Sequence, residues 1–116
     1  MSASYGPLLE ALTRLRGIRG ALVVDRQDGL VVAETLMAGV KGTALAAMAA
    51  NLAASVVDLS TKAGFGTARF LHPQAAAGSL LVAPAGQDVI LVAVAGRDVP
   101  LGLLRLEMLR MAERLT

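Results

Sequence analysis

Apolar residues follow two different spacings along the chain, and these predict an alternation of helices and strands. Leucines at helical spacing in residues 8–16, followed by two glycines, indicate a short helix. Two short apolar runs, 21–24 and 30–33, flank an Asp-Gly turn signal and predict a β-hairpin. Two further apolar runs, 79–83 and 89–95, flank a Pro- and Gly-containing turn and predict a second hairpin.

The middle and the end of the chain add two helices and one strand. Residues 43–62 predict a long helix that ends at glycines. Residues 67–72 alternate apolar and polar side chains before Pro73, which predicts a half-exposed strand near a sheet edge. Residues 101–115 predict a last helix with one apolar side for the core. The predicted order is helix, two strands, helix, three strands, helix, in one domain spanning 1–116.

The long middle helix has two apolar sides. On a helical projection, large side chains form one stripe: Leu45, Met48, Leu52, Val56 and Leu59. Small side chains form a second stripe: Ala46, Ala49, Ala50, Ala53 and Val57. Polar side chains form a third: Asn51, Ser55, Asp58 and Lys62. We expect the large stripe to cover the sheet and the small stripe to pack against another helix, because small residues allow axes to approach to about 8–10 Å or less.

Composition narrows the class of protein. Hydrophobic residues make up 55% of the chain and charged residues 17%, which excludes an intrinsically disordered protein. A monomer surface usually carries ~25–35% charged residues, so we expect another molecule to cover part of this one. The longest apolar runs, such as 44–50, fall far short of the ~20 residues that span a bilayer, so no membrane insertion is expected. The first residues lack the pattern of a signal peptide, which favours a cytoplasmic protein.

The residues available for chemistry are few. The chain has no cysteine and one histidine, so we expect no metal and no cofactor. His72 could form a triad with Ser55 or Ser60 and Asp58, but no serine-hydrolase signature accompanies these residues. The sequence therefore predicts a protein that is not an enzyme.

Charge and aromatic content also bear on the partner. The net charge of +2 is too small to attract a nucleic-acid backbone strongly. One tyrosine, two phenylalanines and no tryptophan make no stacking platform for bases, so no nucleic-acid partner is expected. Arg69, Arg97 and Arg105 could act on a phosphate in trans, but scattered arginines are usually surface charges, and we interpret them so.

Several segments, taken in order, resemble the roadblock/dynein light chain family and its bacterial relatives that regulate small Ras-like GTPases. Residues 12–25 read LTRLRGIRGALVVD and 28–33 read DGLVVA, which matches the family's opening helix, Gly–apolar–x–Gly step and Asp-Gly hairpin. The second half matches in LVAPAGQD at 81–88, the apolar run 89–95 and LGLLR at 101–105. The resemblance implies an α/β (α+β) fold: a five-stranded antiparallel sheet with the first and last helices on one face and the middle helix on the other.

The same resemblance implies a function. Family members dimerise through the middle helix and the strand after it, have no catalysis of their own, and serve as scaffolds or activators for small Ras-like GTPases or as dynein light chains. The chain is thus expected to be a homodimeric regulatory or scaffold module of the gliding-motility type that binds a small Ras-like GTPase or a related signalling or motility partner, with stimulation of GTP hydrolysis among the roles implied. The expected dimer interface is Ala46, Ala49, Ala50, Ala53, Val57, Thr67 and Arg69. The expected partner surface is Asn51, Ser55, Asp58 and Lys62.

Two alternatives stay open from the residues alone. A small-ligand sensor of similar α/β build would hold an apolar molecule between the sheet and a helix, although such a pocket does not require a stripe of alanines. A partner could also dock on the last helix, where Leu103, Leu106 and Leu109 make an apolar ridge on the outer side.

Overall fold

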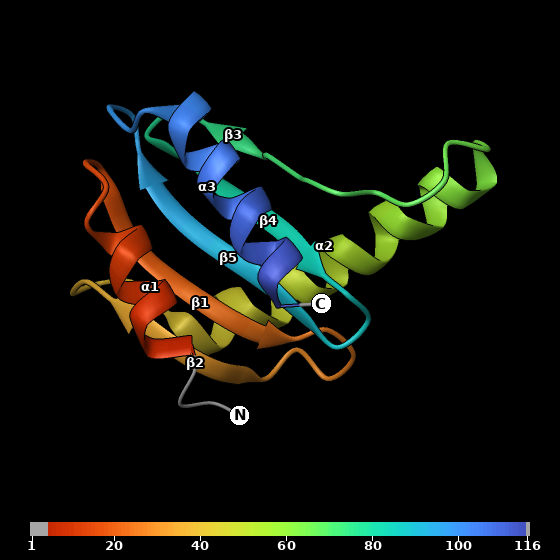
Figure 1. Cartoon of the computed structure of the whole chain (residues 1–116), viewed down its shortest axis with the longest axis horizontal. Helices are drawn as coiled ribbons and strands as arrows, with labels where there is room; N and C mark the ends of the chain where they lie inside the picture. The colour runs from red at the N-terminus through yellow and green to blue at the C-terminus, as the bar shows by residue number, and fades with distance from the viewer. Residues whose placement is uncertain (1–4, 116) are drawn as a thin grey trace.

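A computed structural model describes residues 5–115 as three helices and five strands that form one antiparallel sheet. The elements are α1 (Tyr5–Thr13), β1 (Ile18–Asp25), β2 (Val31–Leu36), α2 (Gly42–Lys62), β3 (Gln74–Ala75), β4 (Gly78–Ala85), β5 (Val89–Gly96) and α3 (Leu101–Arg114). The strand order across the sheet is β2-β1-β5-β4-β3 (Figure 1). The predicted element order is confirmed.

The helices cover both faces of the sheet. α1 and α3 lie on one face, and α2 lies across the other (Figure 1). Leu12 of α1 and Met108 of α3 belong to one buried cluster, and Ala49 of α2 belongs to a second cluster on the opposite face. The layer arrangement implied by the family resemblance is therefore confirmed.

The central strands are mostly apolar because both of their faces are covered. Successive residues of a strand point to opposite faces. In β1, Val23 accordingly packs under α1 and α3, while Leu22 and Val24 pack under α2. β5 alternates in the same way, with Leu91 on the first face and Val92 on the second. This two-sided burial produces the continuous apolar runs seen in the sequence.

The packing side of α2 differs from the prediction. The small stripe contacts the sheet: Ala46, Ala49, Ala50 and Ala53 are at most 6% exposed, within the cluster that holds Leu22 and Val92. Met48 and Leu59 of the large stripe are each 67% exposed. Leu52 and Val56 pack against the margin of this cluster, but the prediction that the large stripe covers the sheet is wrong for Met48 and Leu59. The strands already supply large side chains to this layer, so close packing at interior density requires small ones from the helix.

The predicted strand at 67–72 is also wrong in extent. Within it the structure has one isolated bridge, Leu71 to Val82, and the regular pairing of β3 with β4 begins only at Gln74. Continuing the register of that bridge would place Arg69 opposite Pro84 of β4. Proline has no backbone N–H to donate, so the ladder stops there and residues 67–70 run on unpaired with β4.

Close contact between neighbouring strands leaves no room for a side chain at one glycine. A Cβ added at Gly78 would lie 2.4 Å from the carbonyl oxygen of Ala95 on the neighbouring strand. We expect Gly78→Ala to lower the free energy of unfolding by about 1–3 kcal/mol, the usual cost of overpacking. Gly102→Ala is the control, because nothing lies within 4 Å of a Cβ at that position. Equal midpoints for the two variants in urea unfolding would contradict this account.

Candidate functional surface

The large-residue side of α2, which we define as Leu45, Met48, Leu52, Val56 and Leu59, faces away from the sheet or lies at its margin. Met48 and Leu59 are exposed to solvent. Leu45, Leu52 and Val56 are half-buried, and Leu52 and Val56 pack against the cluster between α2 and the sheet. A hollow of about 370 Å³ separates Leu45 from Leu80 of β4 and from the β3 residues Gln74 and Ala75. Leu45, at the N-terminal end of the large-residue side, therefore faces the same hollow as β3, a strand at the edge of the sheet.

The C-terminal part of α2 projects beyond the sheet, and the chain then returns along an extended path to β3 (Figure 1). Gly64 and Gly66 at this turn have φ angles of 77° and 82°, which L side chains rarely adopt. Phe65 between them is 83% exposed. Together with Leu59, it leaves large apolar side chains in solvent at one end of the molecule, which is a mark of an interaction surface.

By length and composition alone, α2 could also cross a membrane, with a mean hydropathy of 1.4 over its most apolar 18 residues. Core helices of soluble proteins pass the same test. In the fold, the small-residue side of α2 packs against the sheet, so sheet packing accounts for part of the helix's apolar character.

The polar stripe of α2 lies where the sequence places it. Asn51, Ser55, Asp58 and Lys62 are all exposed, next to the large-residue side on the helix surface. Lys62 Nζ donates to Asp58 Oδ2 over 3.0 Å, and this ion pair holds the two charges together one helical turn apart. These side chains add a polar surface beside the apolar one.

The expected dimer interface is only partly accessible. Ala46, Ala49, Ala50 and Ala53 have almost no surface left to offer a second chain, so their assignment to a seam between two helices is wrong. Val57 is half-buried, and Thr67 and Arg69 are exposed on the unpaired segment beside the sheet edge.

The sequence prediction missed Met48, Leu59 and Phe65 as interface candidates. The signal was present for Leu59 and Phe65: both stand close to the glycines that end the long helix, where a helix leaves its sheet. For Met48, the helical projection of α2 shows that the residue belongs to the large stripe. It does not show which of the two apolar stripes faces away from the sheet.

The residues considered for catalysis do not assemble. His72 is half-buried, and its Nε2 atom has no hydrogen-bond partner within residues 5–115. Ser55 and Asp58 are exposed on α2. Among the described residues, no group of three or more His, Asp or Glu side chains comes close enough to hold a metal. The expectation that the chain has no cofactor stays a prediction.

The Asp-Gly hairpin is stabilised as a turn. Asp25 Oδ1 accepts hydrogen bonds from the backbone N–H groups of Gln27 and Asp28, each at 2.9 Å. Such a bond from a side chain to the backbone two residues on is a turn device. The Arg26 side chain donates to the carbonyl oxygen of Gly86, which ties the first hairpin turn to the second.

Comparison with known proteins agrees with this geometry. The family model described as Roadblock/LC7 domain matches residues 5–95. The chain belongs to the Roadblock/LC7 family. A protein of Methanocaldococcus jannaschii whose function is uncharacterised is 35% identical to this Roadblock/LC7 domain over 108 residues, covering 93% of this chain and 92% of the relative.

Solved structures of gliding proteins share the fold. Gliding protein MglB from Thermus thermophilus superposes with a TM-score of 0.82 at 30% identity, covering 94% of this Roadblock/LC7 chain and 83% of that one. MglB from Myxococcus xanthus superposes with a TM-score of 0.89 at 22% identity, covering 99% and 86%. The resemblance to the roadblock family and its gliding-motility members is confirmed.

Proposed function

We propose that this Roadblock/LC7 domain is a homodimeric regulatory or scaffold module, without catalysis of its own, that binds a small Ras-like GTPase in the cytoplasm. The observation that carries the proposal is the exposure of Met48 and Leu59 on the large-residue side of α2, whose first residue, Leu45, faces the same hollow as the edge strand β3. Within residues 5–115, two kinds of group are thus left without a partner: apolar side chains of α2 in solvent and the outer edge of β3.

The dimer is supported by the form of this surface. A two-fold symmetric interface uses the same patch on both copies. The patch must therefore be complementary to a second copy of itself. Apolar side chains such as Met48 and Leu59 meet this condition, because they can pack against the same side chains of a second copy. An edge strand presents unpaired backbone groups that a second copy can pair with. The interface accordingly consists of the large-residue side of α2, β3 and the exposed Thr67 and Arg69.

The GTPase partner is supported by the family and by the polar stripe. The similar structures include gliding protein MglB at 30% identity, and regulation of a small Ras-like GTPase is what the family resemblance implies. In a dimer built on the large-residue side, the polar stripes Asn51, Ser55, Asp58 and Lys62 of the two copies stay accessible. They form a flat, polar surface on which a signalling or motility GTPase docks. Docking at this surface allows the GTP hydrolysis of the GTPase to be stimulated.

Charge variants on the polar stripe test this surface. We expect Asp58→Lys and Lys62→Glu each to change the association rate with a small Ras-like GTPase from the same genome, and the salt dependence of that rate, because rim charges act mainly on association. The melting temperature should hardly move, since an exposed pair of this spacing contributes only about 0.3–0.5 kcal/mol. Surface plasmon resonance at several salt concentrations measures the rates.

Leu106→Glu on the outer side of α3 is the matched variant for the competing surface, because Leu106 is also exposed. It should leave GTPase binding unchanged. If Leu106→Glu abolishes binding while both charge variants bind normally, the partner docks on α3 and the polar surface of α2 is the wrong face.

The alternative of a sensor with an apolar molecule between sheet and helix has less support. On the α2 side, Ala49, Ala53 and Val92 fill that space and are fully buried. The hollows found in the described residues lie at the margins of the layers, so they give no support to a ligand enclosed between α2 and the sheet.

A further inference from the structure

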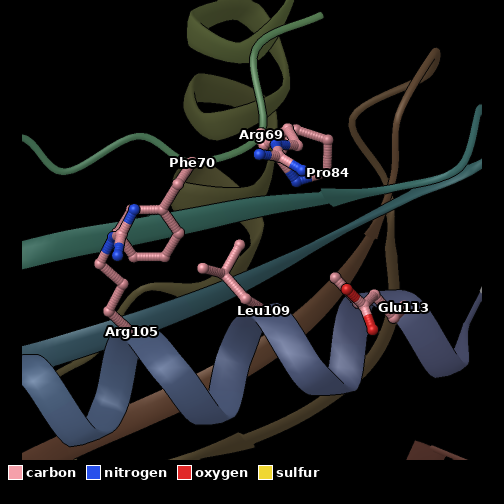
Figure 2. A pocket seen from close by; sticks show the side chains of 7 residues that line it. Arg69, Phe70, Pro84, Arg105, Leu109 and Glu113 are labelled. Atoms are coloured by element: carbon pink, nitrogen blue, oxygen red, sulfur yellow. The ribbon is translucent and has the colours of Figure 1, made fainter.

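A cavity of about 460 Å³ opens between the unpaired segment 67–70, β4 and α3 (Figure 2). Its origin is the interrupted ladder. Pro84 offers no N–H to the segment beside it, so the chain at Arg69 and Phe70 does not close onto β4. The space left between the segment and the sheet is lined on the other side by α3.

Two cations line this cavity from different elements. Arg69 comes from the extended segment and Arg105 from α3. The Arg105 guanidinium carbon lies 5.4 Å from the centre of the Phe70 ring, as a cation–π contact requires (Figure 2). A guanidinium stacked on a ring keeps the N–H groups at its edge available for a planar anion, which it can bind through two parallel hydrogen bonds.

The rest of the lining is mainly apolar. Leu109 points from α3 into the middle of the cavity, with Pro84 across from it (Figure 2). Ala112, one turn further along the helix, is too small to fill the space. The volume falls within the ~300–1,000 Å³ of small-molecule sites, which typically combine apolar walls with a few placed polar groups.

Among residues 5–115, one carboxylate lines the cavity, at the end away from Arg105. Glu113 lies two helical turns beyond Arg105, about 12 Å along the axis. Figure 2 shows the two side chains at opposite ends of the lining, with Leu109 between them. Glu113 also interacts with another group, so this residue is not free. The cavity is therefore polarised, with its positive end at Arg105.

We propose that this cavity binds a small amphipathic anion, with its carboxylate or phosphate head on Arg105 and its apolar body over Leu109 and Pro84. All of the α3 lining lies outside residues 5–95, the part that the family model matches. Apart from Arg69, which also belongs to the proposed dimer interface, the lining lies on the α3 side of the molecule, so the inference does not rest on the GTPase.

Calorimetric titration of the full chain with matched ten-carbon probes tests the proposal. Decanoate and decyl phosphate, kept below their micellar concentrations, carry the two kinds of head, while decan-1-ol carries none and acetate carries no tail. We expect saturable binding of decanoate or decyl phosphate at one molecule per chain. Decan-1-ol and acetate should bind at least about tenfold more weakly, because each lacks one half of the recognised chemistry. The stronger of the two anions identifies the head group.

Three variants locate the site. Arg105→Gln should weaken binding of the anionic probe about tenfold by removing the charge. Leu109→Trp should weaken it by filling the cavity while keeping both arginines. Arg114→Gln, on the same helix but outside the lining, should bind as the parent does. Circular dichroism melts show which variants remain folded, so a loss of binding through unfolding is recognised.

Any one of three results overturns the proposal. If decan-1-ol binds as tightly as decanoate and decyl phosphate, the cavity is a merely apolar hollow. If Arg105→Gln and Leu109→Trp both bind the anion as the parent does, the anion sits elsewhere. An absence of binding by both anionic probes would equally reject it.

Discussion

An Ala53→Glu variant is expected to lose its fold rather than only its dimer. Ala53 is 0% exposed and packs in the cluster between α2 and the sheet. A glutamate there would place an unpaired carboxylate against side chains such as Leu22 and Val92, with no space to reach water. Uncompensated buried charges cost about 3–5 kcal/mol, a large part of the ~5–15 kcal/mol that stabilises a small domain.

Ala54→Glu is the matched control, because Ala54 is the next residue on α2 and is exposed. Its melting temperature should stay close to that of the parent chain, while Ala53→Glu should show no cooperative transition or one far lower. Thermal unfolding followed by circular dichroism measures both. A folded Ala53→Glu protein that has only become monomeric would restore the small stripe as the dimer seam.

The second large effect is expected on assembly. The double variant Met48→Glu and Leu59→Glu should convert the proposed dimer into a folded monomer of 11.9 kDa. Both side chains are 67% exposed in the single chain, so charging them costs the monomer little. In a two-fold interface the same substitutions place four carboxylates in one desolvated patch, where like charges repel and lose their hydration. Light scattering coupled to size exclusion gives the mass.

The control for this prediction is the double variant Ala47→Glu and Ala54→Glu, which adds the same charge on the opposite flank of α2, where both residues are exposed. It should remain dimeric. Two outcomes would reject the proposed interface: a parent chain that already has the monomer mass at micromolar concentration, or a Met48/Leu59 double variant that stays dimeric.

The element order could be predicted because each element depends on local pattern. The Asp25–Gly29 turn is formed by one aspartate and a glycine with a φ of 70°, and both are visible in the sequence. The central strands are apolar on both faces and bounded by turn residues, so they are recognisable without knowing their partners.

The errors arise where two elements must be weighed against each other. The sequence of α2 shows two apolar sides but not the volume that the strands already contribute, and this volume decides that Ala49 rather than Met48 faces the sheet. The extent of the strand after α2 depends on which β4 residue lies opposite each position, and Pro84 becomes a break only once the register is known. The arginine-lined cavity follows from that break, so the sequence shows Arg69 and Arg105 as separate residues but not the site that they line together.

The prolines at 73 and 84 also bear on how the protein avoids aggregation. A long, unpaired edge strand can template the addition of further chains without limit. At the β3 edge the regular ladder is only two residues long, Gln74–Ala75, with Pro73 before it and the Pro84 break beyond the Leu71 bridge. Such an edge supports pairing over a short, fixed register. A strand that pairs in a shifted register finds few backbone groups there with which to form hydrogen bonds. A chain with 55% hydrophobic residues can thus present an open sheet edge to one partner while limiting the growth of fibres from it.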